Sequence, residues 1–94
     1  MNSQEISAGL IRLLRQSPIS REEVTEDVLD LVRAGEEGLA LELICAWIHE
    51  DELEITSDYF NSLETMGDEL GLEVAVRNLS GLVSDSGGQV GIND

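Results

Sequence analysis

Apolar residues recur through most of this chain at the spacing of an α-helix, and this periodicity constrains the fold more than any other feature. Residues at i, i+4, i+7 and i+8 share one face of a helix, whereas a strand would alternate every second residue. The first such face comprises Ile6, Leu10, Leu13 and Leu14. Pro18 ends this segment, because proline lacks an amide donor and disfavours helical backbone at the residue before it. The pattern predicts a first helix that is buried along one side.

A second helix is predicted to begin at Ser20 and to end before Gly35. Ser20 and Glu23 have the spacing of a capping box, in which each side chain bonds the backbone amide of the other residue. Ile19 and Val24 lie where a hydrophobic staple would close over this cap. Gly35 suits the left-handed backbone that commonly follows a helix. The predicted buried face comprises Val24, Val28, Leu31 and Val32.

A third helix, beginning at Glu37 or Gly38, carries two apolar rows. One row comprises Leu39, Leu43, Ala46 and Trp47, and the other comprises Leu41, Ile44, Cys45 and Ile48. A helix that is apolar around most of its circumference is usually buried on several sides, so this one is predicted to be the central helix. Trp47 suits either a core or a protein interface, and its place in an apolar row favours the core.

Thr56 is the predicted N-cap of a fourth helix, with Ile55 and Phe60 as its hydrophobic staple. Gly67 would let a neighbouring helix approach closely, and Gly71 ends the helix. The predicted buried face comprises Tyr59, Leu63, Met66 and Leu70.

Residues 72–83 leave two possibilities open, a weaker fifth helix or a strand, because Val74 and Val76 are residues that strands favour. Residues 84–94 are rich in Gly, Ser and Asp and are predicted to be disordered. The short connections between helices favour antiparallel neighbours. The predicted fold class is therefore all-α: a compact bundle of four to five short helices in a single domain at 1–83, followed by a disordered C-terminal tail at 84–94.

The chain is strongly acidic, because five Arg and no Lys oppose 20 acidic residues, which leaves a formal net charge of −15. Such a protein repels nucleic acid and attracts a basic surface over about 8 Å at physiological salt. We therefore expect a basic protein partner and no direct binding of nucleic acid, whereas a merely solvated surface is the alternative. The predicted partner contacts cap or flank the central helices, and they are Glu36, Glu37, Glu50, Asp51, Glu52, Glu54 and Asp58.

Residues suited to catalysis, metals or cofactors are few. Cys45 lies on an apolar helix face and is predicted to be a small core residue, and His49 suits the C-terminal end of its helix. One Cys and one His cannot form a zinc site, and the acidic residues 50–58 lack the central glycine of a calcium loop. A non-enzymatic protein with no catalytic residues, no metal and no cofactor is expected. The chain shows no signal-peptide pattern and no apolar stretch of membrane-spanning length, so a cytoplasmic location without a membrane partner is expected.

A pattern of apolar residues and glycines runs through the middle of the chain. It comprises the segment from Gly35 to Glu50, and then Ile55, Thr56, Tyr59, Leu63, Met66, Gly67, Leu70, Gly71 and Leu72. Over roughly residues 28–72 this pattern resembles the MafI family of bacterial immunity proteins. The resemblance implies a small cytoplasmic antitoxin that binds the C-terminal toxic domain of a secreted or contact-dependent effector. Many such domains are nucleases with a basic cleft, so the implied mechanism is occlusion of that cleft.

Two other functions remain open at this point. An acidic adaptor or nucleic-acid mimic that regulates a basic DNA-binding protein would carry the same charge. An acyl carrier protein is also a short acidic helical bundle, and that family attaches phosphopantetheine to a Ser that opens its second helix in an Asp-Ser-Leu setting. Here the nearest string is Asn61-Ser62-Leu63, which is predicted to lie inside a helix.

Overall fold

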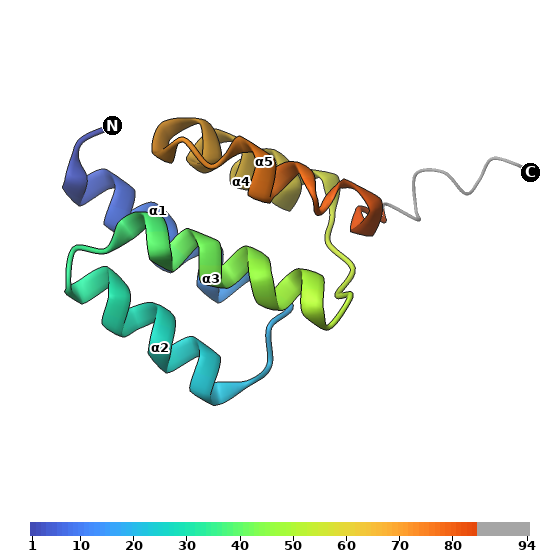
Figure 1. The fold of residues 1–94 in the computed structure, drawn as a ribbon, viewed down its shortest axis with the longest axis horizontal. Coiled ribbons are helices and arrows are strands. Elements are labelled where there is room, and N and C mark those ends of the chain that lie inside the picture. The colour runs from blue at the N-terminus through green and yellow to red at the C-terminus, as the bar shows by residue number, and fades with distance from the viewer. Residues whose placement is uncertain (85–94) are drawn as a thin grey trace, which may run out of the picture.

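Five α-helices and one short 3-10 helix make up most of residues 1–84, the residues that the computed structural model describes (Figure 1). The elements are α1 (Ser3–Gln16), α2 (Glu22–Arg33), α3 (Glu37–Glu50), α4 (Ser57–Leu70), α5 (Glu73–Arg77) and η1 (Ser80–Leu82). The predicted all-α fold class is therefore confirmed. All but the first residue of the predicted disordered tail at 84–94 lies outside the described residues.

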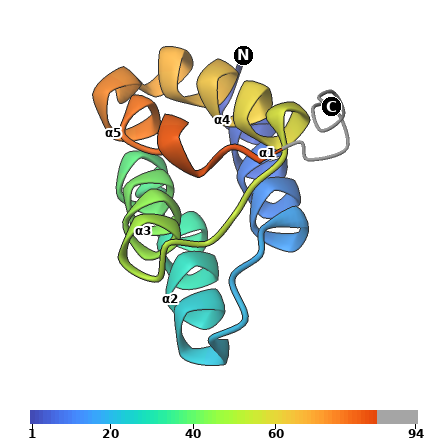
Figure 2. The ribbon, with the colours of Figure 1, turned by 90° about the vertical axis from the view of Figure 1, so that its right-hand side faces the viewer.

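Successive helices run in opposite directions, as the short connections predict (Figure 1). α1 and α3 lie in the middle of the fold, with α2 on one side of them and α4 and α5 on the other (Figure 2). α3 contacts each of the other α-helices, which confirms that it is the central helix. One end of the molecule therefore gathers the end of α2, the start of α3 and the end of α4, whereas the start of α2, the end of α3 and the start of α4 meet at the other (Figure 1).

The core is built mainly from aliphatic side chains on the predicted faces of the helices. Leu10 of α1 and both Leu41 and Ile44 of α3 are fully buried. Burial of an aliphatic side chain of this size stabilises the fold by about 1.5–3 kcal/mol relative to exposure to water. Tyr59 brings a hydroxyl into this core, and that hydroxyl donates a hydrogen bond of 2.7 Å to the carbonyl of Leu13 in the last turn of α1.

Two predicted helix ends are confirmed by their hydrogen bonds. Gly35 follows α2 with a φ of 80°, and its amide donates to the carbonyl of Val32 at 3.0 Å. The amide of Glu36 reaches back to the carbonyl of Leu31 at 2.9 Å, which completes a Schellman motif. Thr56 caps α4, because its hydroxyl oxygen accepts a hydrogen bond of 3.1 Å from the amide of Tyr59 in the first turn.

The capping box predicted at Ser20 and Glu23 does not form, and that prediction was wrong. Arg21 is the N-cap of α2 instead, and no side-chain hydrogen bond caps this helix. The helix begins at Glu22, one residue later than a cap at Ser20 requires, and the guanidinium of Arg21 is bonded there to Asp51 beyond the end of α3.

Residues 72–83 are helical rather than extended over most of their length, since they contain α5 and η1. Val83 then makes an isolated parallel bridge to Ile55. The amide of Ile55 donates to the carbonyl of Leu82 at 3.0 Å, and the amide of Ser84 donates to the carbonyl of Ile55 at 2.8 Å. Ser84, which was predicted to begin the tail, is therefore bonded to the backbone of Ile55.

The close helix approach predicted at Gly67 is confirmed. A Cβ atom added to Gly67 of α4 would lie 2.8 Å from Cγ2 of Val76 on α5. Val76 is almost fully buried, so it has little space into which it can move. The short helix α5 therefore packs against α4 through a contact that only glycine allows.

Gly67→Ala should destabilise the protein, because overpacking costs about 1–3 kcal/mol and the gain in helix propensity returns at most about 1 kcal/mol. Gly38→Ala is the matched control, since a Cβ at Gly38 of α3 meets nothing within 4 Å. This control should be neutral or stabilising. Urea denaturation followed by circular dichroism measures both effects, and equal stability of the two variants would contradict the close packing of α5.

Candidate functional site

The acidic residues predicted to contact a partner are divided between the two ends of α3. Glu36 and Glu37 lie at its start, whereas Glu50 and Asp51 lie at its end. The helix has 14 residues, which separates its two ends by about 21 Å at 1.5 Å per residue. The remaining predicted contacts follow the end of α3, and they are Glu52, Glu54 and Asp58. The structure therefore brings these carboxylates together in two separate groups.

Two of these carboxylates already have partners within the protein. The carboxylate of Glu37 accepts hydrogen bonds from the hydroxyls of Ser3 and Ser7 on α1, at 2.8 and 3.2 Å. The carboxylate of Asp51 accepts two hydrogen bonds from the guanidinium of Arg21, at 2.9 and 3.2 Å. The other predicted contacts have exposed carboxylates that make no hydrogen bond or ion pair within residues 1–84, and they are Glu36, Glu50, Glu52, Glu54 and Asp58.

Arg21 ties the start of α2 to the end of α3 through Trp47 as well as Asp51. Its guanidinium carbon lies 4.8 Å from the centroid of the Trp47 ring, which is within the range of a cation–π interaction. Trp47 is only partly buried and packs against the edge of the core. The prediction that Trp47 is a core residue is therefore confirmed only in part, because the side chain packs against the core but Arg21 lies over its ring.

The outer apolar row of α3, which comprises Leu39, Leu43, Ala46 and Trp47, is only partly covered by the described elements. Leu39 is 50% exposed, Ala46 is exposed, and Leu43 and Trp47 are partly buried. The second predicted row is the buried one, since Leu41, Ile44 and Ile48 are fully buried. Figures 1 and 2 show the reason: α3 lies at one face of the molecule, with its neighbours beside and behind it.

Two shallow hollows lie beside this outer row, and both are lined by Glu42. The first has a volume of about 360 Å³ and lies at the start of α3, where it is lined by Gly35, Glu36, Glu37, Gly38, Leu39, Glu42, Leu70 and Leu72. The second has a volume of about 330 Å³ and lies between α3 and α5, where it is lined by Glu42, Cys45, Ala46, His49, Glu50, Ala75 and Asn78. Both hollows border Glu42 of α3, and we call the two together the α3 groove.

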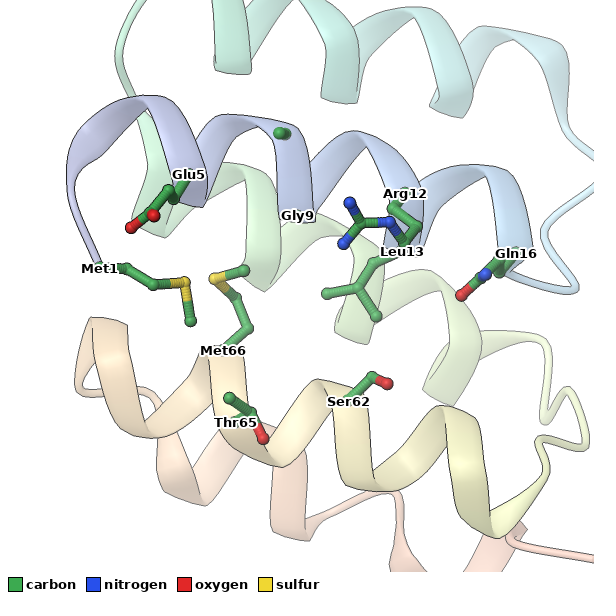
Figure 3. Close-up of a pocket in the computed structure, with 10 residues that line it drawn as sticks. Met1, Glu5, Gly9, Arg12, Leu13, Gln16, Ser62, Thr65 and Met66 are labelled. Carbon is green, nitrogen blue, oxygen red and sulfur yellow. The ribbon is translucent and has the colours of Figure 1, made fainter.

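A larger cleft of about 470 Å³ separates α1 from α4 (Figure 3). Its lining includes Glu5 and Arg12 of α1, whose charges are opposite. Ser62 lines it from α4. The hydroxyl of Ser62 donates to the backbone carbonyl four residues earlier at 3.2 Å, inside the helix, whereas the acyl carrier alternative needs a serine that opens a helix.

The reactive side chains of the core are held in their neutral forms. Cys45 is 3% exposed, and burial, with a smaller contribution from the Glu42 carboxylate, raises the pKa of its thiol to about 12. Burial also raises the pKa of the Tyr59 hydroxyl. Among residues 1–84, no group of three or more His, Cys, Asp or Glu side chains is placed to hold a metal ion. None of the described helices combines the length and the apolar character needed to cross a membrane.

The comparisons with known proteins add no constraint to this geometry. No protein-family model matches the chain, and neither the curated proteins nor the solved structures contain a match. The candidate site therefore rests on the residues themselves, which are the outer apolar row of α3 and the carboxylates around it. Sequence reasoning missed the orientation of that row, and it passed over Glu42 as a polar position within a central helix.

Asp51→Asn tests the contact with Arg21. The hydrogen bond from Arg21 lowers the pKa of Asp51, so folding favours the ionised carboxylate. Its contribution to stability is present above the unfolded pKa of about 3.9 and is lost as the pH falls through the lower folded value. The variant should therefore be less stable than wild type at pH 7. The difference should shrink as the pH falls below about 3.9 and disappear below the lower pKa that Asp51 has in the folded protein.

Glu54→Gln is the matched control, since the Glu54 side chain is exposed and makes no ion pair within residues 1–84. Urea denaturation of both variants and of wild type at several pH values gives the comparison. A stability difference for Asp51→Asn that is the same at every pH would contradict the charged contact.

Proposed function

We propose that this protein is an immunity protein, which binds and neutralises a basic toxin domain by covering its active-site cleft. The observation that carries the proposal is the outer face of α3. There the half-exposed side chain of Leu39 continues into a partly buried row that ends at Trp47. Glu36, Glu42 and Glu50 lie along the same face with exposed carboxylates. An apolar centre with an acidic surround is the arrangement that a basic protein surface complements.

The physical chemistry of this face favours a protein partner over water. An apolar row on a helix gains free energy when it is covered, at about 25 cal/mol for each Å² of apolar area removed from water. Tryptophan is enriched among the residues that contribute most to protein interfaces, and Trp47 lies at one end of the row. The surrounding carboxylates would steer a cationic partner towards this face and repel an anionic one.

The choice of an immunity function comes from the resemblance of residues 28–72 to the MafI family. The toxic domains that such proteins bind are frequently nucleases, and a nuclease holds its polyanionic substrate in a basic cleft. Carboxylates that occupy the phosphate positions in that cleft would exclude the substrate. The mechanism needs no catalytic residue from this chain, and the buried, protonated Cys45 supports that reading.

Charge reversal at the end of α3 tests the proposal. Glu50, Glu52 and Glu54 changed together to Lys should slow association with the purified cognate toxin domain by about tenfold or more. Asp51 is left unchanged, because its contact with Arg21 belongs to the fold. Surface plasmon resonance at low and high salt gives the association rates, and rescue of toxin-expressing cells gives the protection.

The control has the same change in charge on another helix, namely Glu23, Glu26 and Asp27 of α2 changed together to Lys. All three are exposed. A smaller effect of this control, together with a salt dependence that is weaker in the first variant than in wild type, is the expected result. If both variants slow association by the same factor, net charge alone controls association, and the carboxylates at the end of α3 are not a contact.

A further inference from the structure

Glu42 is the one carboxylate that lines both hollows of the α3 groove. It lies in the middle of α3, between the buried Leu41 and the partly buried Leu43, and is itself exposed. Within residues 1–84 the Glu42 carboxylate makes no hydrogen bond or ion pair. A carboxylate in this position is available to a ligand in either hollow.

Each hollow combines apolar surface with carboxylates. In the first, Leu39, Leu70 and Leu72 provide the apolar wall, and Glu36 and Glu37 lie with Glu42 around it. In the second, Ala46 and Ala75 are the apolar residues, and Glu50 lies with Glu42 around them. Long basic side chains match this combination, because lysine and arginine pack their aliphatic stems on apolar surface and extend a cationic head to a polar group.

We infer that the α3 groove binds a segment of the partner that carries two basic side chains, one in each hollow, with the Glu42 carboxylate between their cationic heads. This inference rests on the proposed function and adds the site and the chemistry of the contact. The α3 residues that line the two hollows are about seven positions apart, so the two cations should be roughly 10 Å apart. A helix supplies that distance on one of its faces between residues i and i+7.

A second copy of this chain fits the α3 groove less well than a basic partner. Each copy carries a formal net charge of −15, so two copies repel each other. The charge of the groove therefore selects a cationic occupant from a different protein.

Glu42→Gln tests the inference, since it removes the charge and keeps the size of the side chain. We expect binding to the purified toxin domain to weaken about 30-fold, the size of effect seen when a charged contact at the centre of an interface loses one partner. Glu26→Gln is the matched control, because Glu26 is an exposed glutamate of α2 that lines neither hollow. This control should change the affinity by less than about twofold, within the range of a peripheral surface charge. Both variants should keep wild-type stability in urea.

The outcomes separate this inference from the proposed function. If wild type fails to bind the toxin domain, the proposed function is wrong. If wild type binds, charge reversal at the end of α3 weakens binding, and Glu42→Gln behaves like its control, the inference about the groove is wrong and the function stands. Sedimentation of the isolated protein adds a further check, because a dimer that Glu42→Gln strengthens would place a second copy in the groove and overturn the inference.

Nuclear magnetic resonance gives a second readout that does not depend on a variant. Addition of unlabelled toxin domain to ¹⁵N-labelled protein should shift the backbone amides of Gly38, Ala75 and Asn78, which line the two hollows. The amides of Gly9 and Thr65, which line the cleft between α1 and α4, should change little (Figure 3). The opposite pattern would move the contact to that cleft and overturn the inference.

Discussion

The burial of one side of α3 against every other α-helix is the constraint on which the rest of the structure depends. Leu41, Ile44 and Ile48 have no exposed surface, and each lies on this inner side. Because α3 is central, the connections at its two ends, residues 34–36 and 51–56, lie next to the ends of neighbouring helices. The contact between Arg21 and Asp51 holds the start of α2 at one of those ends. The backbone bonds of Ile55 bring the last described residues to the connection that follows α3.

This arrangement divides α3 into a side that stabilises the fold and a side that is available for binding. The inner side carries the buried Leu41 and Ile44, and the outer side carries the exposed Glu42 and the partly buried Leu43. A change on the outer side therefore alters the surface with little effect on the core. Such a separation suits a protein that recognises a partner through charge, because the recognition surface can vary while the packing of the bundle is kept.

The end of α3 breaks several rules of local stability. Glu50 and Asp51 place negative charge at the helix C-terminus, where the helix dipole favours a cation. Glu52 has a φ of 51°, a left-handed backbone that glycine adopts more easily. Among the described residues, Asp51 is the only one of these three whose carboxylate is paired with a cation, namely Arg21. Departures of this kind concentrate at functional sites, so they support the proposed role of this end of α3 in contacting a cationic partner.

The sequence by itself determined the helical class, the inner faces of the helices and most of their ends. These features depend on residues close together in the chain, such as the Schellman motif at Gly35 and the cap at Thr56. Asn2 and Glu5 form a capping box at the start of α1, which is a further feature that residues close together in the chain determine. The long-range features were decided by the tertiary structure. Which apolar row of α3 stays open, and whether Asp51 is free, depend on contacts between residues distant in the sequence, because a helix can bury only the sides against which other helices pack.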